Sequence, residues 1–401
     1  MIKIGIIREG KNPPDRRVAF TPNQLKTLQQ TYPEFEFLVE SSLERCFSDE
    51  EYENAGISVR SDVSDAEILF GIKEVPVDQL IPDKTYLFFS HTIKKQSKNR
   101  ALLQAILEKN IRLIDYEVLK DEAGNRVVAF GRWAGIVGAY NALWTYGQKT
   151  GLYEIERVKN LQTLDDLKKE LLKVQLPPIK IVVTGAGRVG KGVREVLDVL
   201  KIQEVSAHDF LHLYFDDPVF VVLGSGDFNR RKADGGFDKE EFYQFPEKYE
   251  SHFLKYAEAG EMLIAAAFWN PGAPKLFKLS DLHSPDFSLS VIADITCDVE
   301  GSVPTTLRAS TIKDPVYDIY RETGEEIRPF GHQTSVSVMA IDNLPCELPR
   351  ESSASFGEQL IHWVVPALLE ENSSILERAT LTRDGDLTLE FMYLREFVNK
   401  D

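Results

Sequence analysis

The sequence predicts an α/β protein with two doubly wound parallel sheets around a central cleft. Strand-like and helix-like stretches alternate along the chain, which is typical of parallel sheets covered by helices on both faces. A glycine-rich turn of the kind that opens an α/β domain occurs only near residue 185, so a substantial region precedes it. The 401 residues, 43% of them hydrophobic, suffice for two or three domains with well-filled cores.

The first predicted domain covers residues 1–134 and is completed by residues 333–401. Short apolar runs alternate in it with helix-like stretches. Its expected strands are Ile2–Ile7, Phe35–Val39, Glu67–Ile72, Thr85–Ser90 and Ile111–Tyr116, and its expected helices include Asn23–Gln30 and Arg100–Lys109. A helix-like segment in the returning part, Ala354–Glu371, is expected to cross back onto this domain.

The second predicted domain covers residues 135–332. A run rich in small residues, Gly131–Tyr146, predicts a long and closely packed helix that leads into it. A polar helical stretch, Thr163–Val174, and the stop Pro177-Pro178 come before the glycine-rich turn. The strands expected after that turn include Val219–Leu223, Met262–Ala267 and Ser288–Ile295.

The glycine-rich turn predicts a dinucleotide site in a Rossmann-like domain. A strand-like run, Ile179–Thr184, leads into Gly185-Ala186-Gly187-Arg188-Val189-Gly190, and a helix-like stretch follows. Gly185 permits the tight turn, Gly187 lets the phosphates approach the backbone, and Gly190 lets the helix pack on the strand. The N–H groups and the positive end of the helix attract the anion. A merely structural turn is the alternative, but the flanking strand and helix favour nucleotide binding.

An acidic residue follows the turn at a suitable distance for the ribose. Asp209 comes 24 residues after Gly185 (209 − 185), at the end of a second expected strand, Glu204–Ala207. An acid at such a place binds a ribose hydroxyl pair and repels a 2′-phosphate, so Asp209 favours NAD(H) over NADP(H).

Two ionisable residues occupy matching places in the first domain. Lys73 and His91 each follow the carboxyl end of an apolar strand, and consecutive parallel strands are often neighbours. A partly desolvated lysine has a lowered pKa, and histidine titrates near neutral pH, so the two side chains could transfer protons as a pair. The structural alternative is a solvated strand-end lysine and a hydrogen-bonded histidine.

Basic and polar side chains surround these two strands. They are Arg16, Arg17, Lys94, Gln96 and Arg126. Arginine pairs well with carboxylates, although each of these residues taken alone would fit a surface charge. Together with a dinucleotide site and the lysine–histidine pair, they suggest redox chemistry on a small carboxylate.

The composition of the chain narrows the range of binding partners to expect. The formal net charge of −16 argues against nucleic acid and anionic membranes, and the sequence contains no apolar run long enough to span a bilayer. The three cysteines, Cys46, Cys297 and Cys346, show neither metal-ligand nor disulfide spacing, so no metal is expected and a reduced cytoplasm fits. The N-terminus begins as a strand rather than as a signal peptide. A monomer and a homodimer remain open.

Several sequence strings together resemble the lysine-forming saccharopine dehydrogenases, and in particular the lysine–2-oxoglutarate reductase domain of bifunctional aminoadipic semialdehyde synthases. These strings are Arg16–Pro22, Gly71–Glu74, Phe89–Lys94, Arg112–Glu117, Arg126–Gly131 and Ile341–Pro345. The related alanine dehydrogenase and transhydrogenase families share the lysine after the third strand and an Asn-x-Pro element like Asn343-Leu344-Pro345. The string Ser90-His91-Thr92-Ile93-Lys94 favours saccharopine chemistry instead.

The resemblance implies roles for individual residues. It implies that Lys73 and His91 are an acid–base pair. The substrate contacts that it implies are Arg17, Gln96, Arg126, Phe130, Phe268 and Trp269. The cofactor contacts that it implies are Gly187, Arg188, Asp209 and Asp294, with Asp298 near the nicotinamide. For Asp294 and Asp298 the structural alternative is helix or turn capping.

The function implied by the resemblance is reversible oxidoreduction of saccharopine to lysine and 2-oxoglutarate with NAD(H) or NADP(H). The choice between the two cofactors stays open, because Arg188 and Arg230-Arg231-Lys232 could contact a phosphate while Asp209 favours NAD(H). The two alternatives are a dehydrogenase of a smaller amino acid, such as alanine, and a non-catalytic nucleotide-binding module.

Overall fold

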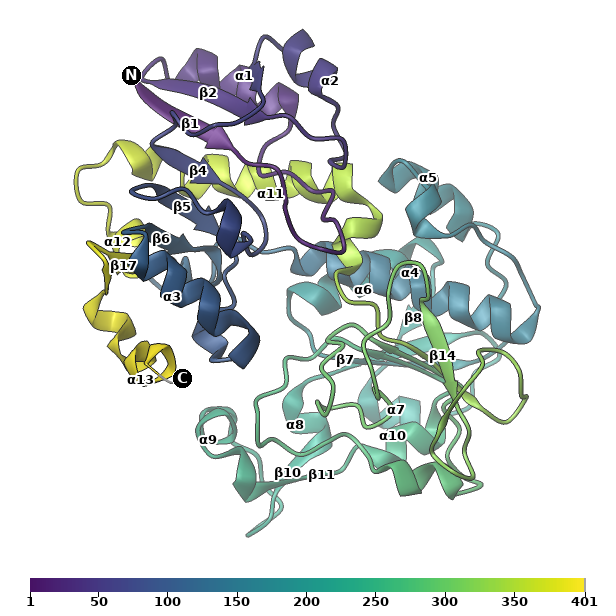
Figure 1. The fold of residues 1–401 in the computed structure, drawn as a ribbon. Coiled ribbons are helices and arrows are strands. Elements are labelled where there is room, and N and C mark those ends of the chain that lie inside the picture. Colours follow the sequence, from purple (N-terminus) through teal and green to yellow (C-terminus); the bar gives the residue numbers. More distant parts are fainter. Residues whose placement is uncertain (400–401) are drawn as a thin grey trace. The chain divides into compact units, whose positions relative to one another are not determined.

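A computed structural model describes residues 1–399 as two compact α/β units. The first unit comprises Met1–Phe130 and the chain from Pro349 onward, and the second comprises Gly131–Leu348. Each is built on an eight-stranded, largely parallel sheet (Figure 1), so the predicted α/β class with two Rossmann-like sheets is confirmed. The second unit extends 16 residues beyond the predicted boundary at residue 332 (348 − 332), because Val336–Met339 pairs within its sheet.

The sheet of the first unit has the strand order β18-β17-β6-β5-β4-β1-β2-β3. Strands β1 to β6 run parallel, whereas β17 pairs antiparallel with β6. The strands are β1 (Ile2–Ile6), β2 (Phe35–Glu40), β3 (Ser58–Arg60), β4 (Ile68–Phe70), β5 (Thr85–Phe88), β6 (Arg112–Asp115), β17 (Thr380–Arg383) and β18 (Asp386–Leu387). The order reverses between β1 and β4, which is where open α/β sheets form a ligand crevice at the carboxyl ends of their strands.

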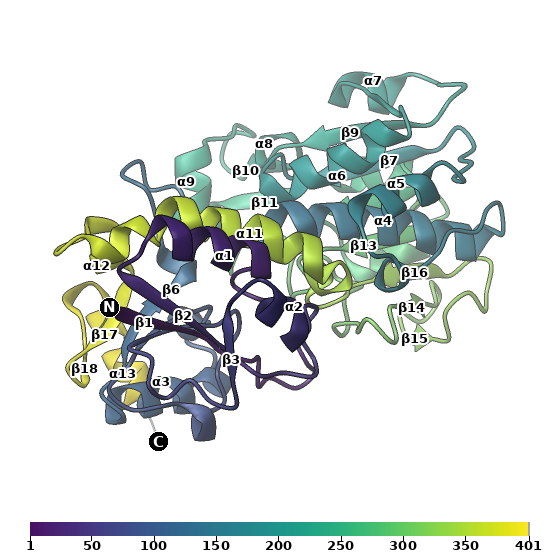
Figure 2. The same ribbon diagram turned by 90° about the horizontal axis from the view of Figure 1, so that it is seen from above.

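Helices cover both faces of this sheet because its strands are apolar on both sides. Neighbouring residues such as Leu69 and Phe70 belong to hydrophobic clusters on opposite faces. The helices are α1 (Pro22–Thr31), α2 (Asp49–Asn54), α3 (Arg100–Glu108), α11 (Pro349–Trp363), α12 (Ser374–Ala379) and α13 (Arg395–Val398). Figure 2 shows α1 and α11 side by side over one face, so a helix from the C-terminal segment helps to close the core of the N-terminal strands.

The sheet of the second unit has the strand order β15-β14-β16-β13-β12-β7-β9-β8. The strands are β7 (Lys180–Thr184), β8 (Gln203–Glu204), β9 (Val219–Leu223), β12 (Met262–Ala265), β13 (Val291–Asp294), β14 (Val316–Ile319), β15 (Glu326–Ile327) and β16 (Val336–Met339). All run in the same direction as β7 except β14, which pairs antiparallel with β16 on one side and with β15 on the other. A separate antiparallel pair, β10 (Asn229–Arg231) and β11 (Tyr249–Ser251), lies outside this sheet.

The helices of the second unit are α4 (Gly131–Thr150), α5 (Leu164–Leu171), α6 (Arg188–Val199), α7 (Ala207–His212), α8 (Ser225–Phe228), α9 (Lys239–Gln244) and α10 (Leu254–Ala259). Helices α4, α5 and α6 share a hydrophobic cluster with Ile181 and Val183 of β7, while α7 and α10 join Val182 on the opposite face. Among the described residues no helix, not even the 20-residue α4, is long and apolar enough to cross a membrane.

The predicted small-residue helix α4 packs so closely on α6 that their backbones approach each other. A Cβ added at Gly135 would lie 2.0 Å from the carbonyl oxygen of Val189, and one added at Gly192 would lie 2.1 Å from that of Arg132. Because the opposing atoms belong to helix backbones, they cannot move aside as a flexible side chain would. Helix α6, which follows the dinucleotide motif, is therefore held against α4 by a close contact that glycines on both helices permit.

Replacing Gly135 by Ala should destabilise the second unit. The added methyl group overpacks the α4–α6 contact at a cost of about 1–3 kcal/mol, although alanine's better helix propensity recovers up to about 1 kcal/mol. Thermal denaturation should show a lower Tm for Gly135→Ala, whereas Gln148→Ala, an exposed change on the same helix, should leave Tm nearly unchanged. An unaltered Tm for Gly135→Ala would contradict the close contact.

Candidate functional site

Three side chains follow strands that meet at the switch point of the first unit. Glu9 follows β1, Lys73 follows β4 and His91 follows β5. The parallel pairing continues beyond the strands, since the N–H of Gly71 donates to Leu87 and the N–H of Phe89 donates to Ile72. This continued register brings Lys73 and His91 to the same edge of the sheet, as the spacing of the two strands predicts.

Lys73 lies among groups that disfavour its charged form. Burial lowers its pKa, and the nearby cations Arg17 and Lys11 lower it further, against the opposing effect of Glu74 and Asp15. A lysine whose pKa is lowered in this way exchanges protons closer to neutral pH than a solvated one does. This environment suits an acid–base group better than a surface charge.

His91 is held in place by a carboxylate that the sequence analysis did not single out. Its Nδ1 lies 2.5 Å from Oε1 of Glu74, and Lys11 lies 3.8 Å from the other carboxylate oxygen. Burial on its own would raise the pKa of Glu74, but the hydrogen bond and charge of His91 outweigh it and lower the pKa to about 2. Glu74 therefore stays ionised near neutral pH and fixes the orientation of the imidazole.

The turn that carries His91 is tied to the next strand. His91 adopts a left-handed backbone conformation with φ of 53°. Just before it, the buried Ser90 donates a 2.5 Å hydrogen bond to Asp115 at the end of β6 and contacts Thr92 at 2.7 Å. Burial raises the pKa of Asp115 to about 6, against the effect of the Ser90 hydrogen bond. The neighbouring strand thus fixes the turn and, with it, the place of His91.

The predicted substrate arginines lie against aromatic rings. The Arg17 guanidinium sits 4.1 Å from the centre of the Phe130 ring, and the Arg126 guanidinium sits 5.2 Å from that of Phe89. Phe89 in turn stacks on His91 and packs against Phe130, which stacks on Phe356 of α11 with centroids 4.4 Å apart. These ring contacts connect four predicted site residues in one cluster, and Phe356 is a member that the sequence analysis missed.

The two arginines differ in what they can offer to an anion. Arg17 is 2% exposed, and its guanidinium forms two hydrogen bonds with Asp15, of 3.0 and 2.6 Å. Arg126 is only half-buried and donates through Nε to the carbonyl of Val128 at 3.1 Å. Gln96 lies on an exposed turn between the 3-10 helices η2 (Thr92–Lys94) and η3 (Ser97–Asn99). Arg126 is therefore the better candidate for a substrate carboxylate.

The glycine motif of the second unit has the geometry of a phosphate-binding turn. Gly185 follows β7 with φ of +92°, and Gly187 stands immediately before α6. A Cβ added at Gly190 would lie 1.9 Å from the carbonyl oxygen of Gly185, whereas one at Gly187 would meet nothing within 4 Å. The turn is thus tightly packed beneath and open at Gly187, where the N-terminus of α6, including the N–H groups of Arg188 and Val189, could receive a pyrophosphate.

The prediction that Asp209 ends a strand near the glycine motif is wrong. The expected strand Glu204–Ala207 is observed as β8, which ends at Glu204 and lies at the sheet edge, separated from β7 by β9. Asp209 lies instead in the first turn of α7, where its N–H donates to the Ser206 hydroxyl at 3.0 Å. Serine capping of a helix competes here with strand extension.

The strand next to the motif points to a different acid. β9 ends at Leu223, and Asp227 follows four residues later, half-buried, with one carboxylate oxygen 2.7 Å from the N–H of Gly224. The inserted β8 and α7 place Asp227 42 residues after Gly185 (227 − 185), about twice the usual spacing for the ribose-binding acid. That long spacing is why the sequence analysis missed it.

The remaining predicted contacts of the second unit lie at the carboxyl end of β13 and on the loops after β12 and β13. Asp294 is fully buried, and its Oδ1 accepts a hydrogen bond from the N–H of Thr296 at 3.1 Å, which is the turn capping considered as its structural alternative. Its carboxylate also accepts 2.6 Å hydrogen bonds from the hydroxyls of Thr296 and Thr306. Asp298 is exposed. Phe268 is 77% exposed and lines a narrow pocket with Trp269, whose indole N–H donates to Ala273.

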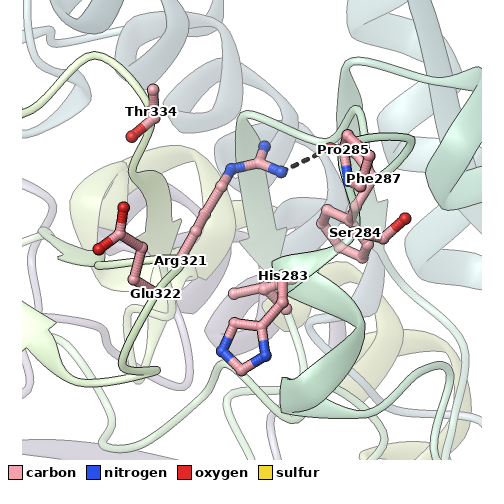
Figure 3. A pocket seen from close by; sticks show the side chains of 8 residues that line it. His283, Ser284, Pro285, Phe287, Arg321, Glu322 and Thr334 are labelled. Atoms are coloured by element: carbon pink, nitrogen blue, oxygen red, sulfur yellow. Dashed lines mark hydrogen bonds between the residues drawn. The ribbon is translucent and has the colours of Figure 1, made fainter.

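A larger hollow of about 660 Å³ lies away from the glycine motif. His283, Phe287, Arg321 and Glu322 are among its lining residues (Figure 3), and they flank the amino end of β13, opposite the carboxyl ends where the motif lies. The Arg321 guanidinium donates to the main-chain carbonyls of Phe287 and Leu289 at 2.5 and 2.7 Å. These two hydrogen bonds give Arg321 a structural role.

Comparison with known proteins agrees with the resemblance that the sequence strings indicate. Residues 5–137 match the family model "alanine dehydrogenase/PNT, N-terminal domain". The chain is 31% identical to mouse mitochondrial alpha-aminoadipic semialdehyde synthase, over 97% of this chain and 47% of that protein. It is 28% identical to saccharopine dehydrogenase (NAD(+), L-lysine-forming) of Emericella nidulans, over 93% of this chain and 94% of that protein. The predicted resemblance to saccharopine dehydrogenases is confirmed. The chain spans about half the length of the semialdehyde synthases.

Solved structures support the fold. An L-alanine dehydrogenase superposes with a TM-score of 0.65 at 16% identity, covering 99% of this chain and all of that one. A transhydrogenase from Sinorhizobium meliloti superposes with a TM-score of 0.62 at 15% identity, covering 96% of this chain and all of that one. At such low identity these matches bear on architecture alone.

Proposed function

We propose that this protein interconverts saccharopine with L-lysine and 2-oxoglutarate, using a nicotinamide dinucleotide as the hydride carrier. The observation that carries the proposal is the cluster of Lys73, His91 and Glu74 at the switch point of the first unit, in a chain similar to saccharopine dehydrogenases along most of its length. A proton-transfer cluster in one unit and a dinucleotide turn in the other are the two parts that such a reaction needs.

The chemistry asks for proton transfer at several points. In the synthetic direction the ε-amine of lysine condenses with the ketone of 2-oxoglutarate, water leaves, and the resulting imine is reduced. The dinucleotide, when bound, supplies the hydride. In this proposal Lys73, with its lowered pKa, and His91, oriented by Glu74, take the proton from the amine and return it to the departing hydroxyl.

The substrate's carboxylates need local cations, because the chain as a whole carries a net charge of −16. Arg126, half-buried beside Phe89, is our candidate for one carboxylate. Lys94 is exposed and lies 3.4 Å from Glu117, so a substrate anion could compete for it. Arg17 is already paired with the buried Asp15, so we expect it to hold the Phe130 ring in place and to add positive charge near the site, rather than to bind an anion directly.

The second unit favours NAD(H) over NADP(H). Asp227 stands at the carboxyl end of the strand beside the glycine motif, where a carboxylate can accept hydrogen bonds from ribose hydroxyls and would repel a 2′-phosphate. Asp209, which the sequence analysis used for the same argument, is displaced into α7. We therefore base the cofactor proposal on Asp227.

A smaller amino-acid substrate is the second candidate, because the family match over residues 5–137 and the similar architecture both involve alanine dehydrogenases. The proposal predicts that NADH is consumed faster with lysine and 2-oxoglutarate than with ammonia and pyruvate.

Lys73→Met should lower kcat by about 100-fold or more, the scale of lost general acid–base catalysis, without changing the Kd for NADH. Lys84→Met, at the opposite end of β5, serves as the control. Faster turnover of ammonia with pyruvate by the wild type would favour the alanine-type alternative, and binding of NADH without turnover of either pair would favour a non-catalytic module.

Arg126→Ala should raise the KM for 2-oxoglutarate while leaving the KM for NADH unchanged. Loss of one charge-assisted hydrogen-bonded contact costs about 1.5–3 kcal/mol, or roughly tenfold to 150-fold in affinity. Steady-state kinetics on the mutant and on Arg60→Ala, which changes an arginine of β3, would separate a local effect from the loss of one positive charge. Similar KM values for the two variants would remove Arg126 from the site.

Asp227→Ala should weaken the binding of NADH and strengthen the binding of NADPH relative to that of NADH. The physical reason is that a 2′-phosphate no longer meets a carboxylate beside the glycine turn. Fluorescence titration of both cofactors against Asp227→Ala and Asp209→Ala would measure the ratio of the two Kd values. We expect the ratio to change only for Asp227→Ala, and a change confined to Asp209→Ala would restore the original assignment.

A further inference from the structure

Glu9 binds the main chain of the segment that carries the candidate acid–base lysine. It follows β1, and its two carboxylate oxygens accept hydrogen bonds from two consecutive N–H groups, from Ile72 at 2.6 Å and from Lys73 at 2.9 Å. A Cβ added at Gly71 would lie 2.9 Å from Cδ1 of Ile7 and 3.4 Å from Oε1 of Glu9, so glycine leaves room for both side chains. Two hydrogen bonds accepted by one carboxylate fix both the position and the orientation of this turn.

This arrangement places a carboxylate where its charge is unfavourable. Burial and the neighbouring Asp15 raise the pKa of Glu9 to about 8, while the two N–H donors and Arg17 oppose that rise. A helix cap or surface acid would carry no such cost. A buried ionisable side chain is costly to keep where an apolar one would fit, so the position of Glu9 indicates that the segment after β4 has to be held in one place.

We propose that Glu9 is a positioning residue, which clamps the main chain at Ile72 and Lys73 and so holds the Lys73 side chain within its desolvated surroundings. Those surroundings are set by charged groups on two segments: Lys11, Asp15 and Arg17 after β1, and Glu74 beside Lys73 itself, which in turn pairs with His91 after β5. The proposed catalytic role of Lys73 rests on the proposed function, but the clamp does not.

The direction in which the lysine's pKa moves distinguishes a clamp from a charge effect. If Glu9 acts only as a nearby anion, its removal takes away a group that favours the ammonium form, and the pKa of Lys73 falls further. If Glu9 acts as a clamp, its removal lets the side chain reach water, desolvation is relieved, and the pKa rises toward the ordinary lysine value. The two explanations predict opposite signs.

The experiment measures the pH dependence with which an amine-specific reagent modifies Lys73, followed by peptide mass spectrometry. It compares the wild type with Glu9→Ala and with Glu9→Asp, which keeps the charge but is too short to reach both N–H groups. Both variants should shift the labelling curve of Lys73 to higher pH. In steady-state assays both should lower kcat by about 10-fold to 100-fold, the effect expected of a misplacement near 1 Å, with an unchanged Kd for NADH.

Glu67→Gln is the matched control, because Glu67 precedes β4 at its other end and accepts a weak 3.4 Å hydrogen bond from the N–H of Lys3. It should match the wild type in labelling and kcat. Circular dichroism and Tm establish that each variant is folded. Should Glu9→Ala fail to fold, Glu9→Asp alone decides. Labelling that shifts to lower pH, or a kcat of Glu9→Asp equal to that of the wild type, would overturn the clamp.

The labelling readout needs no substrate, so the two proposals fail separately. A shifted labelling curve in a protein that does not turn over saccharopine would leave the clamp standing and remove the proposed function. An unshifted curve in an enzyme that does turn over saccharopine would remove the clamp and leave the function standing.

Discussion

The parallel register of β4 and β5 is the constraint on which the candidate acid–base cluster depends. Phe70 pairs with Leu87, and the pairing continues through Gly71 and Phe89 beyond the ends of both strands. A slip of one residue would turn each apolar side chain to the other face of the sheet, and both faces are buried under helices. Core packing therefore fixes the place at which Lys73 and His91 leave the sheet, without any contact between those two side chains being required.

Burial of charge around that edge is balanced locally. Asp15 neutralises the almost fully buried Arg17, and Glu74 is paired with His91 and lies near Lys11. Leaving one member of a buried pair alone costs about 3–5 kcal/mol, so each charge holds its partner in place. Beside these pairs the half-buried Arg126 lies over the Phe89 ring, on a chain whose net charge is −16. A local cation of this kind could attract a carboxylate that the overall field repels.

The second unit shows how an insertion alters the interpretation of a motif. The strand, turn and helix around Gly185 form as their sequence predicts, because those signals are local. The neighbour of β7 is decided by strand pairing over a longer range. The chain first forms the edge strand β8 and the short helix α7, and only then returns as β9 beside β7. Counting residues from the first glycine therefore leads to Asp209, whereas the topology leads to Asp227.

The sequence by itself determined the α/β class, the positions of the strands that it named to within a few residues (Glu204–Ala207 excepted), the glycine turn, the long helix α4 and the shared edge of Lys73 and His91. These depend on local propensity and hydrophobic pattern, which each segment carries within itself. Only the tertiary structure decided that Glu74 pairs with His91, that Phe356 from the C-terminal segment joins the aromatic cluster, that Glu9 reaches the backbone of Lys73 and that Arg17 is engaged by Asp15. Except for Asp15 and Arg17, these contacts join residues 17 or more positions apart. Even the Asp15–Arg17 pair depends on burial, which no local pattern encodes.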